Sequence, residues 1–196
     1  MKSTIALFQE DELPPKHPRV TDKRPTKVET ILKKVDWHTY EQNVLTLVKG
    51  AITSFSQSPE VTPVCQLSLL TDAQTGHSIL SFETRKNRAD VEEKDNHFVQ
   101  MEKIDRVPHT INDNPREFRF WAWASYYHRE LDGLNLLDFA VPSHRQAADR
   151  RIAASLRNVI NTCWDGNVLM PLPLDLPFHI GINGVKDWFC VVKVLK

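Results

Sequence analysis

The chain has 196 residues, of which 41% are hydrophobic and 26% are charged, so it can bury a core without disulfide or metal support. Its 25 basic residues balance its 25 acidic residues. This balance argues against a nucleic-acid-binding domain and against attraction to an anionic membrane, because both need an excess of Lys and Arg.

The three cysteines, Cys65, Cys163 and Cys190, are odd in number and lie in apolar patterns. This arrangement predicts buried core thiols and not a disulfide framework. The apolar run from Ile5 to Phe8 is too short for a signal peptide, and no run approaches the roughly 18 residues of a membrane helix. We therefore expect a cytoplasmic protein with no membrane partner.

Residues 1–36 are expected to form an extended, Pro-rich, basic N-terminal arm, and residues 37–196 a single domain. Four prolines in this segment exclude a regular helix over most of it, and seven Lys or Arg residues lie between Lys16 and Lys34. The arm could serve a nucleic-acid accessory protein or be a solvated tail. No aromatic residue interleaves the charges, which makes nucleic acid unlikely. Residues 28–35 could form a helical turn or a strand that docks on the domain.

Two long amphipathic helices are predicted, at residues 39–56 and 143–163. In each, apolar residues recur at the spacing of one helix face. Thr39 with Gln42, and Ser143 with Gln146, match the spacing of a capping box. A single apolar face on each helix is typical of helices packed on a sheet.

A β-hairpin is predicted over residues 63–84, because two alternating segments flank a turn that ends at Gly76. The prolines at 171, 173 and 177 predict an extended edge or polyproline-like segment, and Asn183-Gly184 predicts a second hairpin. The last strand, within residues 188–195, is apolar on both faces and should be central or covered on both sides. The fold class is therefore α+β, a mostly antiparallel sheet with the two helices on one face.

The segment from residue 112 to 128 holds six of the 17 aromatic residues. It could be a helix that starts at Pro115, or a strand over residues 117–124 with Trp121 and Trp123 on the opposite side from Phe118 and Phe120. Either arrangement places bulky rings on two faces, so some could form a binding hot spot, although all of them could also be core. The candidate partner-binding residues are Trp121, Trp123, Tyr126 and Tyr127, with Asp90, Glu92 and Glu93 as a polar rim.

Three stretches carry a resemblance to a known family: Cys65-Gln-Leu-Ser-Leu, Leu80-Ser-Phe-Glu-Thr84 and the block from Trp121 to Tyr127. In this order of elements the chain is similar to bacterial immunity proteins of polymorphic-toxin systems, over about residues 39–196. The resemblance implies an α+β scaffold without catalytic residues that neutralises one cognate toxin by steric occlusion.

The alternative class is a small hydrolase that uses His128 with Glu130. No nucleophile elbow or phosphate-binding loop appears, and the chain has six glycines, so we expect neither an enzyme nor a cofactor. His97, His109 and His128 could be assembled as a metal triad, but they lack the spacing of a zinc site, and no metal is expected.

Overall fold

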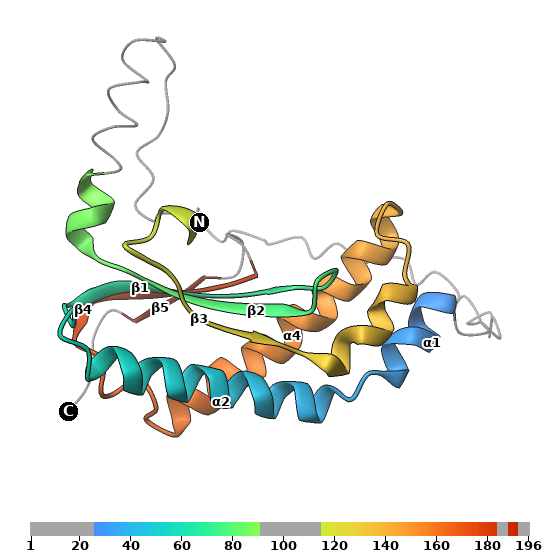
Figure 1. Ribbon diagram of the computed structural model, residues 1–196, viewed down its shortest axis with the longest axis horizontal. Helices are drawn as coiled ribbons and strands as arrows, with labels where there is room; N and C mark the ends of the chain where they lie inside the picture. The colour runs from blue at the N-terminus through green and yellow to red at the C-terminus, as the bar shows by residue number, and fades with distance from the viewer. Residues whose placement is uncertain (1–25, 91–114, 184–187, 192–196) are drawn as a thin grey trace, which may run out of the picture.

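The computed structural model describes residues 26–90 and 115–183, and the backbone of residues 188–191. Five strands form one sheet in the order β3-β2-β1-β4-β5 (Figure 1). The strands are β1 (Val64–Asp72), β2 (His77–Glu83), β3 (Phe120–Tyr127), β4 (Leu174–Ile182) and β5 (Trp188–Val191). The helices are α1 (Lys27–Lys34), α2 (Trp37–Ser56) and α4 (Pro142–Asp165), with 3-10 segments η1 (Pro115–Glu117) and η2 (Arg129–Leu136). A further helical segment covers residues 85–90.

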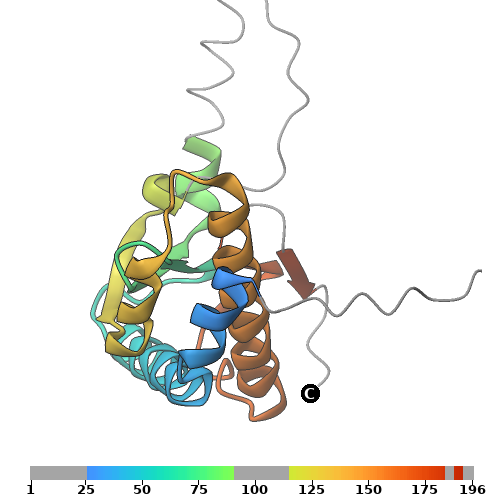
Figure 2. The same cartoon turned by 90° about the vertical axis from the view of Figure 1, so that its right-hand side faces the viewer.

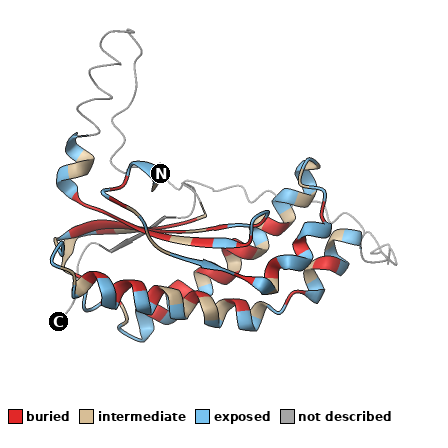
Figure 3. Ribbon diagram, viewed as in Figure 1, coloured by how far each residue is buried: buried red, intermediate tan, exposed pale blue. Residues whose placement is uncertain are grey.

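The predicted α+β class is confirmed. The β1–β2, β2–β3 and β4–β5 pairs are antiparallel and the β1–β4 pair is parallel, so the sheet is mostly antiparallel. Helices α2 and α4 contact each other and pack on the same side of the sheet (Figures 1 and 2). Buried residues lie on the surfaces that the helices and the sheet turn toward one another (Figure 3).

The predicted hairpin over residues 63–84 is confirmed as β1 and β2. Leu69 pairs with Leu80 and Leu67 pairs with Phe82, and all four side chains are fully buried in the core. Gly76 has a φ of 69°, the left-handed conformation that the turn needs. Cys65 and Cys163 are buried free thiols, as predicted, while the side chain of Cys190 lies outside the described residues.

Both predicted helices form, but their predicted caps are wrong. Helix α2 begins earlier, because the side chain of Asp36 accepts a hydrogen bond from the Thr39 amide at 3.0 Å. Helix α4 has Val141 at its N-cap, with no hydrogen bond from a cap side chain, and Pro142 in the first turn. Proline fixes a helical φ and lacks the amide that a cap would satisfy, so it replaces the predicted Ser143 box.

The helical alternative is the one adopted at residues 28–35. Helix α1 begins with a capping box in which Thr26 and Glu29 exchange two hydrogen bonds. Ile31 and Val35 are each 7% exposed and join the main core. The last part of the predicted arm therefore packs against the domain, whereas residues 1–25 lie outside the described part of the chain.

The order of the last two strands agrees with the prediction in part. The Pro-rich segment was predicted as an extended edge or polyproline-like segment; its end forms the start of β4, which runs parallel to β1, while β5 pairs with residues 178–181, past the last proline. Pro177, which follows a cis peptide bond, still lies within β4. Strand β5 lies at an end of the described sheet, so the central alternative is wrong, while the alternative of cover on both faces depends on side chains outside the described residues. Neither order could be inferred from hydrophobic periodicity, which specifies the faces of a strand and not its neighbours.

Candidate functional site

The aromatic segment forms the edge strand β3, so its helical alternative is wrong. The predicted strand is shifted: Pro115 starts the short η1 turn, and β3 runs from Phe120 to Tyr127. The register with β2 is irregular between Leu80 and Phe82, where Ala122 takes a φ of 51°. This bulge interrupts the alternation of side chains along the strand.

The bulge brings Phe120 and Trp123 to the same side, although we predicted opposite sides. Both rings contact Phe55 of α2 edge-on, with centroids 5.0 and 5.1 Å away. The indole N–H of Trp123 also donates to the Ser54 hydroxyl at 3.0 Å. Trp123 is half-buried as a result and fastens β3 to α2.

The other predicted aromatic residues differ in exposure. Trp121 is half-buried, whereas Tyr126 is 42% exposed and Tyr127 is 44% exposed. The Tyr127 hydroxyl donates to Asp132 at 2.5 Å, and this bond raises the pKa of the phenol. The exposed rings therefore lie at the end of β3, next to η2.

A buried polar chain supports these tyrosines from within the core. The Tyr40 hydroxyl donates to Thr71 at 2.8 Å, Thr71 is hydrogen-bonded to Ser78 at 2.6 Å, and Ser78 is hydrogen-bonded to His128 Nε2 at 2.7 Å. The His128 ring also lies edge-on to the Tyr126 ring, with centroids 4.8 Å apart. Burial lowers the pKa of His128 to about 4, so the ring is neutral at physiological pH.

The buried network of Tyr40, Thr71, Ser78 and His128 does not present a nucleophile to solvent. Ser78 and His128 are both 0% exposed, and Glu130 accepts a hydrogen bond from the Asn43 amide. The serine, the imidazole and the phenol therefore bridge α2, the sheet and the start of η2. Of the predicted hydrolase pair, His128 belongs to this buried network, whereas Glu130 is half-buried and bonded to Asn43.

A groove of about 360 Å³ runs between α2 and β3. Its described lining is uncharged and consists of Asn43, Thr46, Leu47, Gly50, Ala51, Ser54, Ala124 and Tyr126. The groove therefore opens directly beside an exposed tyrosine. The sequence analysis missed it, although a glycine in the middle of an amphipathic helix was a signal that could have indicated it.

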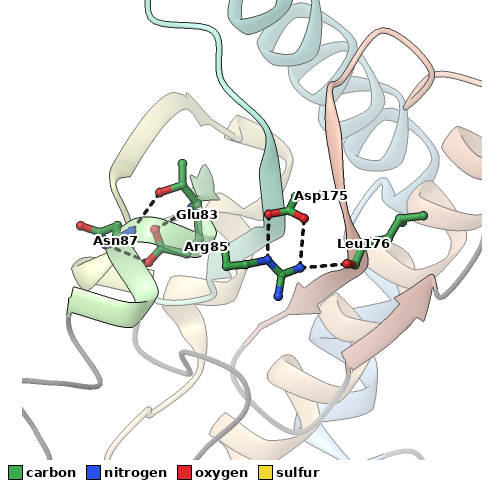
Figure 4. A network of polar contacts seen from close by, with 6 residues as sticks. Glu83, Arg85, Asn87, Asp175 and Leu176 are labelled. Atoms are coloured by element: carbon green, nitrogen blue, oxygen red, sulfur yellow. Dashed lines mark hydrogen bonds and ion pairs between the residues drawn. The ribbon is translucent and has the colours of Figure 1, made fainter.

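A buried carboxylate fixes the other end of β3. Glu83 is 0% exposed, and its carboxylate accepts hydrogen bonds from the amides of Thr84 at 2.8 Å and Arg119 at 3.1 Å. The side-chain amide of Asn87 donates to the same carboxylate at 3.0 Å and to the Glu117 carbonyl at 2.9 Å (Figure 4). Glu83 thus joins the end of β2 to residues 85–90 and to the approach to β3.

An exposed ion pair lies beside this network. Arg85 donates two hydrogen bonds to Asp175, at 2.8 and 3.1 Å, and a third to the Leu176 carbonyl at 2.9 Å (Figure 4). The pair connects the chain after β2 to β4, but both side chains are partly in water. Solvent screening makes its contribution to stability small.

Replacing Glu83 with Gln is expected to lower the free energy of unfolding by about 1–2 kcal/mol. The amide offers one acceptor oxygen and turns an N–H₂ group toward donors. The matched control is Asp175→Asn in the exposed ion pair, which we expect to lower the free energy of unfolding by about 0–1 kcal/mol. Urea unfolding followed by circular dichroism measures both, and equal losses would contradict a special role for the buried carboxylate.

The described member of the predicted polar rim does not join the exposed tyrosines. Asp90 lines a separate cleft of about 520 Å³ with Arg119 and Phe120, at the start of β3. From the rise of a strand, this cleft lies about 20 Å from Tyr126. Glu92 and Glu93 lie outside the described residues.

No helix among the described residues is long and apolar enough to cross a membrane. Within those same residues, no three His, Cys, Asp or Glu side chains gather as a metal site would require, while His97 and His109 fall outside them.

Comparison of the chain with family models, curated proteins and solved structures found no match. The resemblance to immunity proteins therefore stays a prediction that rests on the residues that carry it.

Proposed function

We propose that this chain is a protein-binding module whose partner docks at the end of β3, where Tyr126 and Tyr127 are exposed on the two faces of the strand. The observation that carries the proposal is the exposure of two adjacent tyrosines, 42% and 44%, on an edge strand. Tyrosine is enriched at binding hot spots because it buries a large ring and keeps a polar tip.

Both rings are held in place before any partner arrives. Tyr127 is fixed by its bond to Asp132 and by the His77 ring, whose centroid lies 5.0 Å away. Tyr126 packs on His128, which belongs to the buried polar chain. Side chains that are already ordered lose little conformational entropy on binding, which favours affinity.

Alanine at both Tyr126 and Tyr127 is expected to weaken partner binding at least about tenfold, since hot-spot truncations cost more than about 1.4 kcal/mol. Trp164→Ala is the matched control, because Trp164 is 46% exposed on the last turn of α4 and belongs to no proposed surface. Affinity capture from the source cell, with quantitative mass spectrometry, compares the recovered partner. Recovery that falls equally with both variants, or with neither, contradicts the proposal.

The finer proposal is that the partner is a toxin that this chain neutralises by steric occlusion. It is supported by the resemblance of the Cys65–Leu69, Leu80–Thr84 and Trp121–Tyr127 stretches to immunity proteins. Occlusion needs a rigid surface and no catalytic group, which suits the tyrosine pair. Co-expression with each adjoining gene tests it: one such gene should arrest growth, and this chain should relieve the arrest unless both tyrosines are alanine.

A further inference from the structure

We propose that the partner contributes an extended segment that adds as a new strand to the outer edge of β3 and places an uncharged side chain in the groove over Gly50. This inference rests on the proposed function and specifies its binding mode. It is carried by the direction of the β3 backbone groups, by the composition of the edge and by the space above Gly50.

The register of β2 and β3 shows which backbone groups face outward. The His128 amide donates to the Gly76 carbonyl at 2.8 Å. In an antiparallel pair, hydrogen-bonded and non-bonded residue pairs alternate, so Tyr126 turns its N–H and C=O toward Ser78. Ser125 and Tyr127 then turn theirs away from β2, toward the open edge. Among the described strands, β3 has one neighbour, β2.

The edge lacks two of the features that keep sheet edges from pairing, charged residues and proline, although it carries the bulge at Ala122. Its sequence, Phe-Trp-Ala-Trp-Ala-Ser-Tyr-Tyr, contains no charged residue and no proline. Edge strands of soluble proteins usually carry charges or prolines, because an open row of amides and carbonyls recruits another strand. The bulge at Ala122 distorts the first half of β3, so the regular half, residues 124–127, is the part left open to pairing.

The groove supplies a place for a side chain of the added strand. Apart from its two chain neighbours and the backbone of its own helix, a Cβ built on Gly50 has no atom of the described residues within 4 Å, and the described lining carries no charge. Glycine weakens a helix relative to alanine, and no contact with another described residue requires it here. A glycine at this position leaves room for a segment of another protein to approach the helix closely. Because the lining carries no charge, we expect the side chain that enters the groove to be uncharged.

The probe is a phage library of random peptides about ten residues long, enough for one strand, selected against the full chain. Selected peptides should bind Gly50→Leu at least about tenfold more weakly than the original chain. Leucine is the better helix former, so thermal unfolding should show no loss of stability. The control is Thr53→Leu, which adds the same side chain to an exposed position of α2 outside the groove.

Hydrogen exchange supplies a test that needs no variant. The bound peptide should slow exchange of the Ser125 and Tyr127 amides, and Ser125→Pro, which removes an outward donor, should abolish binding. Three results would overturn the proposal. The selected peptides could protect other amides, they could bind Gly50→Leu as well as the original chain, or the library could yield no binder. A concentration-dependent dimer that dissociates with Ser125→Pro would assign the edge to a second copy and also overturn it.

The two proposals fail separately. If alanine at Tyr126 and Tyr127 abolishes capture of the natural partner while Gly50→Leu and Ser125→Pro leave it intact, the tyrosine surface stands and strand addition is wrong. If the tyrosine variant captures the partner normally, the proposed surface itself is wrong, whatever the peptides do.

Discussion

Replacing Phe55 with alanine is expected to lower the free energy of unfolding by about 3–5 kcal/mol, the usual cost of removing a fully buried phenylalanine. Phe55 is 0% exposed, and its ring contacts Phe82 at 4.5 Å, Phe120 at 5.0 Å and Trp123 at 5.1 Å between centroids. The loss removes both the transfer free energy of the ring and the contacts around the cavity. It is a large share of the roughly 5–15 kcal/mol that stabilises a typical domain.

The Phe55→Ala substitution should also affect the proposed binding surface, because Phe55 contacts Trp123 of β3. Trp123 is held to α2 by Phe55 and by Ser54, so the cavity would loosen β3 where the groove begins. Phe139→Ala is the control, because Phe139 packs against the same core but is half-buried. Urea unfolding at neutral pH, followed by circular dichroism, measures both variants. A loss no larger for Phe55 than for Phe139 would show that the ring cluster does not anchor β3.

The elements with a clear period could be predicted from the sequence. Helices α2 and α4 and the β1–β2 hairpin appear where apolar residues repeat, because burial of one face dominates their energetics. Strand order could not be predicted, since the parallel pairing of β1 with β4 depends on contacts between residues more than a hundred positions apart. The caps failed for a local reason: Asp36 and Pro142 start their helices before the residues that match the box pattern.

The structure of the aromatic segment was predicted in part. The aromatic spacing fitted both a helix and a strand, and the bulge at Ala122, which brings Phe120 and Trp123 together, has no signal in the pattern of apolar residues. The exposure of Tyr126 and Tyr127 follows from the edge position of β3, which is a property of the whole sheet. Two signals were present and informative: Gly50 inside a helix, and an uncharged strand.

Acidification is expected to destabilise the fold through His128. The pKa of this imidazole is lowered from the ordinary 6.5 to about 4: burial is the largest cause, Glu130 partly opposes the shift, and nearby His77 adds to it. Above pH 6.5 both folded and unfolded chains hold a neutral ring, so the group has no effect. As the pH falls from 6.5 to 4, the unfolded chain binds a proton that the folded chain does not, and stability decreases.

The full difference in pKa corresponds to at most about 3 kcal/mol, and solvent screening reduces this to about 2 kcal/mol. His128→Gln isolates the contribution, because glutamine can keep the hydrogen bond to Ser78 and does not titrate. The gap in unfolding free energy between the original chain and the variant should narrow by about 2 kcal/mol between pH 7 and pH 4.5. If the unfolding free energies of the original chain and of His128→Gln changed in parallel with pH, the His128 ring would have to be charged in the folded core at pH 4.5. That result would be hard to reconcile with a buried Nδ1 that has no hydrogen-bond partner among the described residues.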